Sequence, residues 1–182
     1  MLKRFETPTH YACYVGEDTP SPTANAHVLE ALGAAAPGDS ARIAKISDWL
    51  AACQRPDGSW QDKWHASPYY AVACCAPAIH RYGLGTQAHQ TVSRALNWLR
   101  DTRHPDGSWG VWGGTAEETA YALLTFARCN APPPPSLATA LAHLTLDPAP
   151  PALWHDKDLY CPVRIVHATI RAARHLYTQQ RA

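Results

Sequence analysis

Aromatic side chains collect at three places in the chain, each at or near the point where a loop leads into a segment with helical character. The residues concerned are Trp64, His65, Tyr69, Tyr70, Trp112, Tyr121, Trp154 and Tyr160. Trp and Tyr combine a large apolar face with a polar edge, and the face of such a ring stabilises a nearby cation by roughly 0.5–2 kcal/mol. These residues could line an apolar cavity, or they could only pack one helix pair against the next.

Two neighbouring carboxylates and one histidine are the candidate polar groups. Glu117 and Glu118 stand at the start of an expected helix, where the helix dipole favours acidic side chains. Thr115 is the expected N-cap, with Glu118 at the capping-box position. A capping role and a polar role at a cavity mouth both stay open for the pair. His65 is a candidate base, with a structural hydrogen-bonding role as the alternative.

An internal repeat must position these residues. Pro-Asp-Gly-Ser-Trp occupies positions 56–60 and recurs 49 positions later at 105–109. Before each copy, apolar residues recur at three- and four-residue steps, which predicts a helix that ends near the proline. Asp-Gly then supplies a turn. We expect the Trp to fill the gap between successive helix pairs and an Ala-rich helix to follow it.

The repeat predicts an all-α fold of about seven helices. Four inner helices are expected at 19–33, 67–81, 116–129 and 159–176, and three outer helices at 40–54, 88–103 and 136–146. Pairs of polar outer helices and Ala-rich inner helices fit a curved array of the α/α-toroid type. The chain supplies fewer pairs than a closed ring needs, so we expect a partial barrel. Its inner faces, rich in Ala, Cys and aromatic residues, would then be exposed until a partner covers them.

Composition narrows the class of function. The 182 residues are 46% apolar with a formal net charge of +1, as in one globular domain with a packed core. The lack of a polybasic run argues against nucleic acid as a partner, and no apolar stretch has the length of a membrane span. The N-terminus does not read as a signal peptide, so we expect a cytoplasmic protein. Six dispersed Cys without zinc spacing predict buried, reduced thiols.

The repeats resemble those of a known superfamily. The segments 54–60 and 103–110 are similar to the QW-type repeats of terpene cyclases and prenyltransferases. Four further segments are similar to bacterial class II diterpene cyclases of the copalyl-diphosphate-synthase type, in order along nearly the whole chain: 19–33, 62–71, 114–124 and 153–166. The resemblance implies that residues 1–182 form part of the α/α-barrel β domain of that family. It also places the aromatic segments around the active-site cavity.

The resemblance implies a reaction as well. Family members convert geranylgeranyl diphosphate to a bicyclic prenyl diphosphate. An acid in a D-x-D-D motif protonates the terminal alkene, rings close through carbocations, and a base removes the last proton. The aromatic residues above would form the pocket wall, with His65 as the candidate base and Glu117 and Glu118 as polar support. Mg²⁺ could accompany the diphosphate, although the chain holds no ligand motif for it.

The chain departs from the family at the initiating acid. None of the 182 residues forms a D-x-D-D motif, and the carboxylate clusters at 17–18 and 156–158 do not match it. In the family this motif lies just upstream of the stretch similar to 5–33. We therefore expect the C-terminal part of a cyclase, with the D-x-D-D segment and the γ domain absent. A partner chain would supply the acid and the rest of the barrel.

Other interpretations stay open at this point. The chain could be a catalytically inactive, truncated remnant or a module that binds a prenyl lipid. It could also close its own barrel as a homo-oligomer, with Asp62 or Glu118 as a different acid. Protein prenyltransferase β subunits share the toroid but need a zinc site, for which the spacing is absent. A two-carboxylate glycosidase is supported only by the type of barrel.

Overall fold

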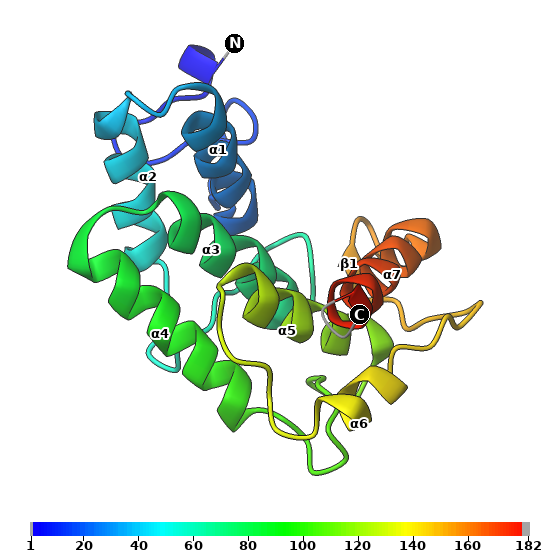
Figure 1. Ribbon diagram of the computed structural model, residues 1–182. Helices are drawn as coiled ribbons and strands as arrows, with labels where there is room; N and C mark the ends of the chain where they lie inside the picture. The colour runs from blue at the N-terminus through cyan, green and yellow to red at the C-terminus, as the bar shows by residue number, and fades with distance from the viewer. Residues whose placement is uncertain (1, 180–182) are drawn as a thin grey trace.

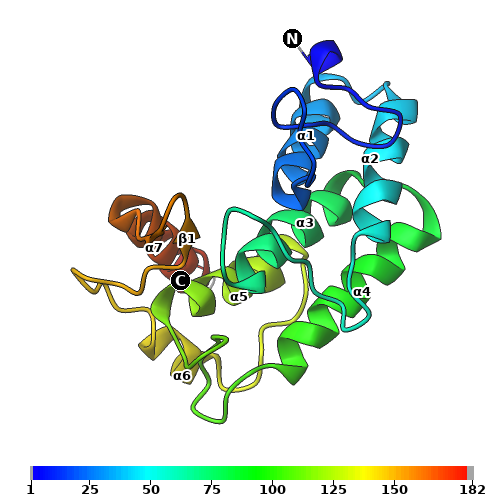
Figure 2. The ribbon, with the colours of Figure 1, turned by 180° about the vertical axis from the view of Figure 1, so that it is seen from behind.

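Within residues 2–179, seven α-helices form a curved array in two layers (Figures 1 and 2). The computed structural model describes residues 2–179. The inner helices, each in contact with the next, are α1 (Pro22–Ala35), α3 (Pro68–Tyr82), α5 (Ala116–Arg128) and α7 (Val163–Gln179). The segments between them carry α2 (Ser40–Ala52), α4 (Gly85–Asp101) and α6 (Leu137–Ala142). This arrangement confirms the expected partial α/α barrel. None of the helices within residues 2–179 is long and apolar enough to cross a membrane.

Several helix bounds differ from the prediction, and prolines account for the late starts of α1 and α7. α1 begins at Pro22, a residue preorganised for the first helical position, with Ser21 as its N-cap. Helix α6 covers only Leu137–Ala142 and is therefore shorter than the predicted 136–146. α7 begins only after Pro162, because a residue before proline disfavours the helical conformation.

A small β-hairpin replaces the expected start of α7. Strand β1 (Trp154–His155) pairs antiparallel with β2 (Leu159–Tyr160). Strands this short could not be predicted, since two residues cannot show an alternating pattern. The hairpin stands beside the N-terminal end of α7 (Figure 1).

The repeated turn has one geometry in both copies. Asp57 Oδ1 accepts hydrogen bonds from the Ser59 backbone N–H at 2.9 Å and from its hydroxyl at 2.8 Å. Gly58 lies between them at φ 97°, a conformation that glycine adopts at no steric cost. Residues 106–108 repeat both hydrogen bonds and the positive φ. The spacing of the repeat therefore records a repeated backbone structure.

The Trp of each repeat is fully buried and caps the preceding outer helix. The Trp60 indole N–H donates to the Leu50 carbonyl at 2.8 Å, and the Trp109 indole N–H donates to the Leu99 carbonyl at 2.7 Å. Both carbonyls belong to the last turn of their helices, where the α-helix leaves four carbonyls without an internal partner. The predicted sealing role of these two residues is confirmed, and a capping role is added to it.

The Ala- and Cys-rich part of α3 is not exposed, and that expectation was wrong. Residues 71–79 are all buried, because α1 and α5 pack on either side of α3 and α4 packs along it as well. The large apolar side chains that are exposed within the described residues lie mainly in loops, in the hairpin and on α7. They are Tyr14, Val15, Trp64, Leu84, Val111, Trp112, Leu146, Leu159, Tyr160, Ile165 and Leu176.

The prediction of buried, reduced thiols holds for half of the cysteines. All six are free; Cys74, Cys75 and Cys129 are buried, whereas Cys13, Cys53 and Cys161 are partly exposed. Burial raises the pKa of Cys74 and of Cys129 to about 12. These two thiols therefore act as small apolar groups in the core.

Candidate functional site

Three aromatic rings surround one buried histidine near the ends of α3 and α5. The ring centroids of Tyr70, Trp154 and Tyr121 lie 5.0, 5.1 and 5.9 Å from that of His65. Tyr70 also lies 5.5 Å from Tyr121 and 4.8 Å from Trp154, in tilted geometry. Tilted and edge-to-face arrangements are the ones that aromatic pairs prefer. We call these four residues the aromatic cluster.

The hairpin brings Trp154 to the cluster from a distant part of the chain. Its backbone is bonded to the loop before α3: the Ala66 N–H donates to the Leu153 carbonyl at 2.8 Å, and the His155 N–H donates to the Trp64 carbonyl at 3.0 Å. The other members of the cluster come from that loop, from α3 and from α5. The cluster therefore requires two inner helices and the hairpin to be packed together.

A buried carboxylate, that of Glu117, holds the polar edges of the cluster. Its side chain is 1% exposed. Its Oε1 accepts hydrogen bonds from the Trp154 indole N–H at 2.9 Å and from the Tyr121 hydroxyl at 3.1 Å, and His65 Nε2 lies 3.4 Å away. The second oxygen, Oε2, is buried without a partner among the described residues. Burial, followed by the nearby carboxylate, raises the pKa of Tyr121, so this hydroxyl keeps its proton.

His65 is engaged at both ring nitrogens. Its Nδ1 accepts a hydrogen bond from the Ser67 backbone N–H at 3.0 Å. Its Nε2 lies 3.4 Å from Glu117 Oε1 and can donate a hydrogen bond to it when the ring proton is on this nitrogen. The geometry favours the structural hydrogen-bonding role that the sequence left open. The role of His65 as a base stays a prediction.

Glu118 is as buried as Glu117, but it belongs to the helix cap. The Thr115 hydroxyl oxygen accepts from the Glu118 backbone N–H at 3.1 Å. The Glu118 carboxylate accepts from the Thr115 hydroxyl at 2.8 Å and from the Val111 N–H at 3.1 Å. The capping interpretation is confirmed for Glu118. The side chain of Glu117 takes no part in this cap, so the two neighbours divide the two roles that the sequence left open.

Tyr69 lies apart from the aromatic cluster, and its role in a substrate pocket stays a prediction. Its ring is buried against Trp98 of α4, with 4.6 Å between the ring centroids, and its hydroxyl donates to the Thr102 carbonyl at 3.4 Å. Successive residues of an α-helix point about 100° apart. Tyr69 and Tyr70 therefore face the outer and inner layers respectively, and the sequence alone did not separate them.

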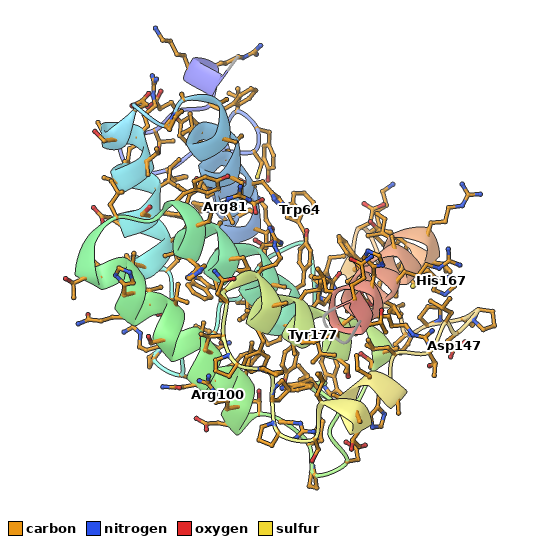
Figure 3. All side chains as sticks on the ribbon, in the orientation of Figure 1. Trp64, Arg81, Arg100, Asp147, His167 and Tyr177 are labelled. Atoms are coloured by element: carbon orange, nitrogen blue, oxygen red, sulfur yellow. The ribbon has the colours of Figure 1, made fainter. Side chains whose placement is uncertain are left out.

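Three predicted pocket residues are exposed, two of them in loops and one in strand β2. Trp64, Trp112 and Tyr160 have exposed fractions of 40%, 74% and 45%. In the view of Figure 3, Trp64 lies in the opening between α1 and α7. None of the three belongs to the aromatic cluster, and their role in a pocket stays a prediction.

Asp62, the alternative acid, is fully used in holding the fold. Its Oδ2 accepts from the Ser21 hydroxyl at 2.7 Å and from the Thr23 N–H at 2.9 Å. Its Oδ1 accepts from the Trp64 N–H at 3.0 Å. Asp62 therefore ties the loop before α3 to the first turn of α1, and this arrangement gives no support to a role as proton donor.

A cavity of about 310 Å³ opens beside the first turn of α5, where the sequence left open a polar role at a cavity mouth for Glu117 and Glu118. Thr115 and Glu117 form one side of it, and His143, Asp147 and Ile170 belong to the other lining residues. The lining combines α5 with α6, α7 and the loop between those two. Only the folded chain brings these parts together, because no local pattern signals such an assembly.

The described residues do not offer a donor set for a metal ion. Between residues 2 and 179, no three His, Cys, Asp or Glu side chains come together in an arrangement that could hold one. Mg²⁺ prefers near-octahedral oxygen coordination, usually with carboxylates. Glu117, with its free oxygen, is a single carboxylate, so the site as built here does not fit Mg²⁺ held by this chain alone.

Comparison with known proteins identifies related chains. Residues 14–161 match the squalene-hopene cyclase C-terminal domain. Labda-7,13-dienyl diphosphate synthase of Streptomyces clavuligerus is 49% identical over 182 residues, which cover 93% of this chain and 33% of that protein. Copalyl diphosphate synthase of Streptomyces anulatus is 47% identical over 186 residues, covering 95% and 34%.

A solved structure agrees with these sequence matches. The ent-copalyl diphosphate synthase from Streptomyces platensis superposes with a TM-score of 0.82 at 46% identity, over 96% of this chain and 36% of that one. The chain thus spans about a third of the length of the relatives it matches. The similarity to class II diterpene cyclases is confirmed, and the chain belongs to the squalene-hopene cyclase C-terminal domain family.

Proposed function

We propose that this chain forms part of the active site of a class II diterpene cyclase. The reaction is the conversion of geranylgeranyl diphosphate to a bicyclic prenyl diphosphate, started by protonation of an alkene. The initiating acid is supplied from outside these 182 residues, which contain no D-x-D-D motif. The proposal includes a cytoplasmic location and an assembly with a protein partner or, as the alternative, with further copies of the chain.

One observation carries the proposal. This chain belongs to a cyclase family, and three of its electron-rich rings surround the buried His65. Tyr70, Tyr121 and Trp154 come together from α3, α5 and the hairpin. Relatives named as copalyl and labdadienyl diphosphate synthases share 47% and 49% of the residues over nearly this whole chain. The function of the relatives therefore supports the chemistry proposed for the cluster.

The cluster suits a reaction that passes through carbocations. The ring faces can stabilise positive charge by roughly 0.5–2 kcal/mol each. Burial raises the pKa of Tyr70 and of Tyr121, so neither phenol offers a phenolate that would trap a cation. Exclusion of water by packed rings protects a reactive intermediate from quenching. In this proposal the role of the chain is to supply the wall, and the role of the partner is to supply the proton.

Mg²⁺ enters the proposal only as a counter-ion that arrives with the diphosphate. The described residues hold no group of three metal-ligating side chains. The proposed role of this chain in cyclisation therefore involves its aromatic and polar residues and assigns no step to the metal.

A complementation assay tests the proposed function. The chain is produced alone and together with the segment of the Streptomyces anulatus copalyl diphosphate synthase that lies outside its match to this chain. Each sample receives geranylgeranyl diphosphate, and the dephosphorylated products are identified by gas chromatography and mass spectrometry. A bicyclic product is expected only when both polypeptides are present.

The control is the same pair with the catalytic acid of the D-x-D-D motif changed to Asn in the relative's segment, which should abolish the product. A folded, co-purifying pair that makes no product would contradict the proposal. Binding of geranylgeranyl diphosphate by the chain without turnover in any combination would instead support a prenyl-lipid binding module. The observation that favours a binding module as the second candidate function is the lack of a D-x-D-D motif in this sequence.

A further inference from the structure

One buried acceptor oxygen holds two of the three rings of the aromatic cluster. Within residues 2–179, Glu117 is the sole hydrogen-bond partner of the Trp154 indole N–H, at 2.9 Å, and of the Tyr121 hydroxyl, at 3.1 Å. A buried N–H or O–H group is costly to leave unpaired. The two rings are therefore held in the orientations that point their donors at one atom, Glu117 Oε1.

The hydrogen bond from Trp154 to Glu117 matters because the hairpin that carries Trp154 is short. The residue lies in a hairpin of two strands with two residues each, and an isolated two-stranded hairpin is marginally stable in water. Both residues of β2, the partner strand, are exposed. Backbone bonds fix the position of β1 beside the loop before α3, but they do not set the rotation of the indole ring. The side-chain bond to Glu117 supplies that restraint.

We propose that Glu117 is a positioning residue for the cyclisation. Its Oε1 sets the orientation of Trp154 and Tyr121, and thereby the shape of the wall against which the isoprenoid folds. This inference rests on the proposed function and adds to it the residue that fixes the geometry of the wall. Glu117 acts through the two aromatic side chains and needs no contact with the reacting carbons.

The two carboxylate oxygens of Glu117 differ in their hydrogen bonds, and this difference predicts the effect of substitutions. Oε1 receives the donors, whereas Oε2 has no partner among the described residues. Glu117→Gln keeps an acceptor oxygen at the same distance along the side chain, so it should retain the ring orientations. Glu117→Leu keeps a similar volume but removes the acceptor, so the Trp154 and Tyr121 donors lose their partner, and so does His65 Nε2 at 3.4 Å. Gln and Leu therefore separate positioning by a hydrogen bond from simple filling of space.

The neighbouring residue provides a matched control. Glu118 is also 1% exposed and lies on the same helical turn, but its carboxylate binds the Thr115 hydroxyl and the Val111 N–H. Glu118→Leu removes a buried carboxylate without touching the cluster. It should lower the stability of the fold and leave the orientation of the rings unchanged.

The first measurement needs no activity. The indole N–H signal of Trp154 is identified among those of the seven Trp in a ¹H–¹⁵N NMR spectrum, by comparison with Trp154→Phe. Glu117→Leu should shift this signal and speed its exchange with solvent by about tenfold or more, because a buried hydrogen bond is lost. Glu117→Gln and Glu118→Leu should leave the signal near its wild-type position with slow exchange.

The second measurement uses the two-chain assay. Glu117→Leu should lower kcat by about tenfold or more and divert product to other cyclised or deprotonated isomers, with little change in KM, because a small misplacement of the reacting geometry is costly. Glu117→Gln should restore most of the rate and the wild-type product pattern. Glu118→Leu should keep the wild-type product pattern in whatever fraction of the protein is folded.

The outcomes separate the two claims. A wild-type pair without product overturns the proposed function, and the indole signal still shows whether Glu117 holds Trp154. If the pair is active and Glu117→Leu gives the wild-type product pattern, the positioning role is overturned. A Glu117→Gln variant as impaired as Glu117→Leu also overturns it, since the negative charge rather than the acceptor would then be required.

Discussion

Substitution of Trp109 by Phe should test the double role of the repeated Trp. Trp109 is fully buried and its indole N–H is the cap of the Leu99 carbonyl at 2.7 Å. Phe removes this hydrogen bond and leaves the carbonyl buried and unpaired, which costs about 1–3 kcal/mol. The smaller ring adds a cavity term, and the sum is a loss of about 2–4 kcal/mol in the free energy of unfolding.

Urea unfolding followed by circular dichroism measures this loss, and melting curves give a second estimate. For a chain of this size, the melting temperature should fall by roughly 5–12 °C. Trp60→Phe should cost a similar amount, because the same bond recurs at Leu50 with a length of 2.8 Å. Trp112→Phe is the control: this residue is 74% exposed, and its substitution should change stability by no more than about 0.5 kcal/mol. The capping argument fails if Trp109→Phe is as mild as Trp112→Phe.

Two further predictions concern the N-terminal segment and the loop before α5. The pKa of Glu6 is lowered from its ordinary 4.5 to about 2, first by the Arg42 guanidinium and then by Lys45. This stabilisation is present above pH 4.5 and is lost as the pH falls towards 2, so the stability difference between wild type and Glu6→Gln should shrink over that range. Urea midpoints at several pH values measure it, and a difference that stays constant down to pH 2 would contradict the ion-pair argument. Gly110→Ala should destabilise the fold by about 1–3 kcal/mol or more, since the added Cβ would meet the Gly113 carbonyl oxygen at 1.8 Å; a melting temperature equal to that of the wild type would show that the loop yields freely.

The fold could be predicted largely from sequence because its signals are local and repeated. Pro-Asp-Gly-Ser-Trp marks the end of an outer helix, a turn and a filling residue within five positions, and both copies adopt that structure. The β-hairpin could not be predicted in this way. Its strands are too short for a pattern, and the backbone around β1 is bonded to the loop at 64–66, which is a tertiary contact.

The presence of aromatic residues at the candidate site could be predicted from sequence, but the direction that each side chain faces could not. The sequence placed aromatic residues at the ends of inner helices, but one position along a helix decides which layer a ring faces. Tyr69 packs on α4 while Tyr70 joins the cluster. Glu117 and Glu118 both stand at the start of α5, and their side-chain partners separate their roles: Glu117 binds Trp154 of the distant hairpin, whereas Glu118 binds Thr115 and Val111. Pairings across the chain therefore carry the information that local patterns lack.

The contacts of Asp62 restrict how this protein can be recombined with its relatives. One side chain joins residues on either side of it in sequence: the Ser21 hydroxyl and Thr23 N–H at the start of α1, and the Trp64 N–H in the loop that also carries His65. A chimaera that exchanges residues 61–66 without the segment at 21–23 would bury a carboxylate against a foreign surface. Crossover points that keep these two segments together should give folded hybrids more often, so α1, although it contributes no ring, should travel with the cluster in any exchange.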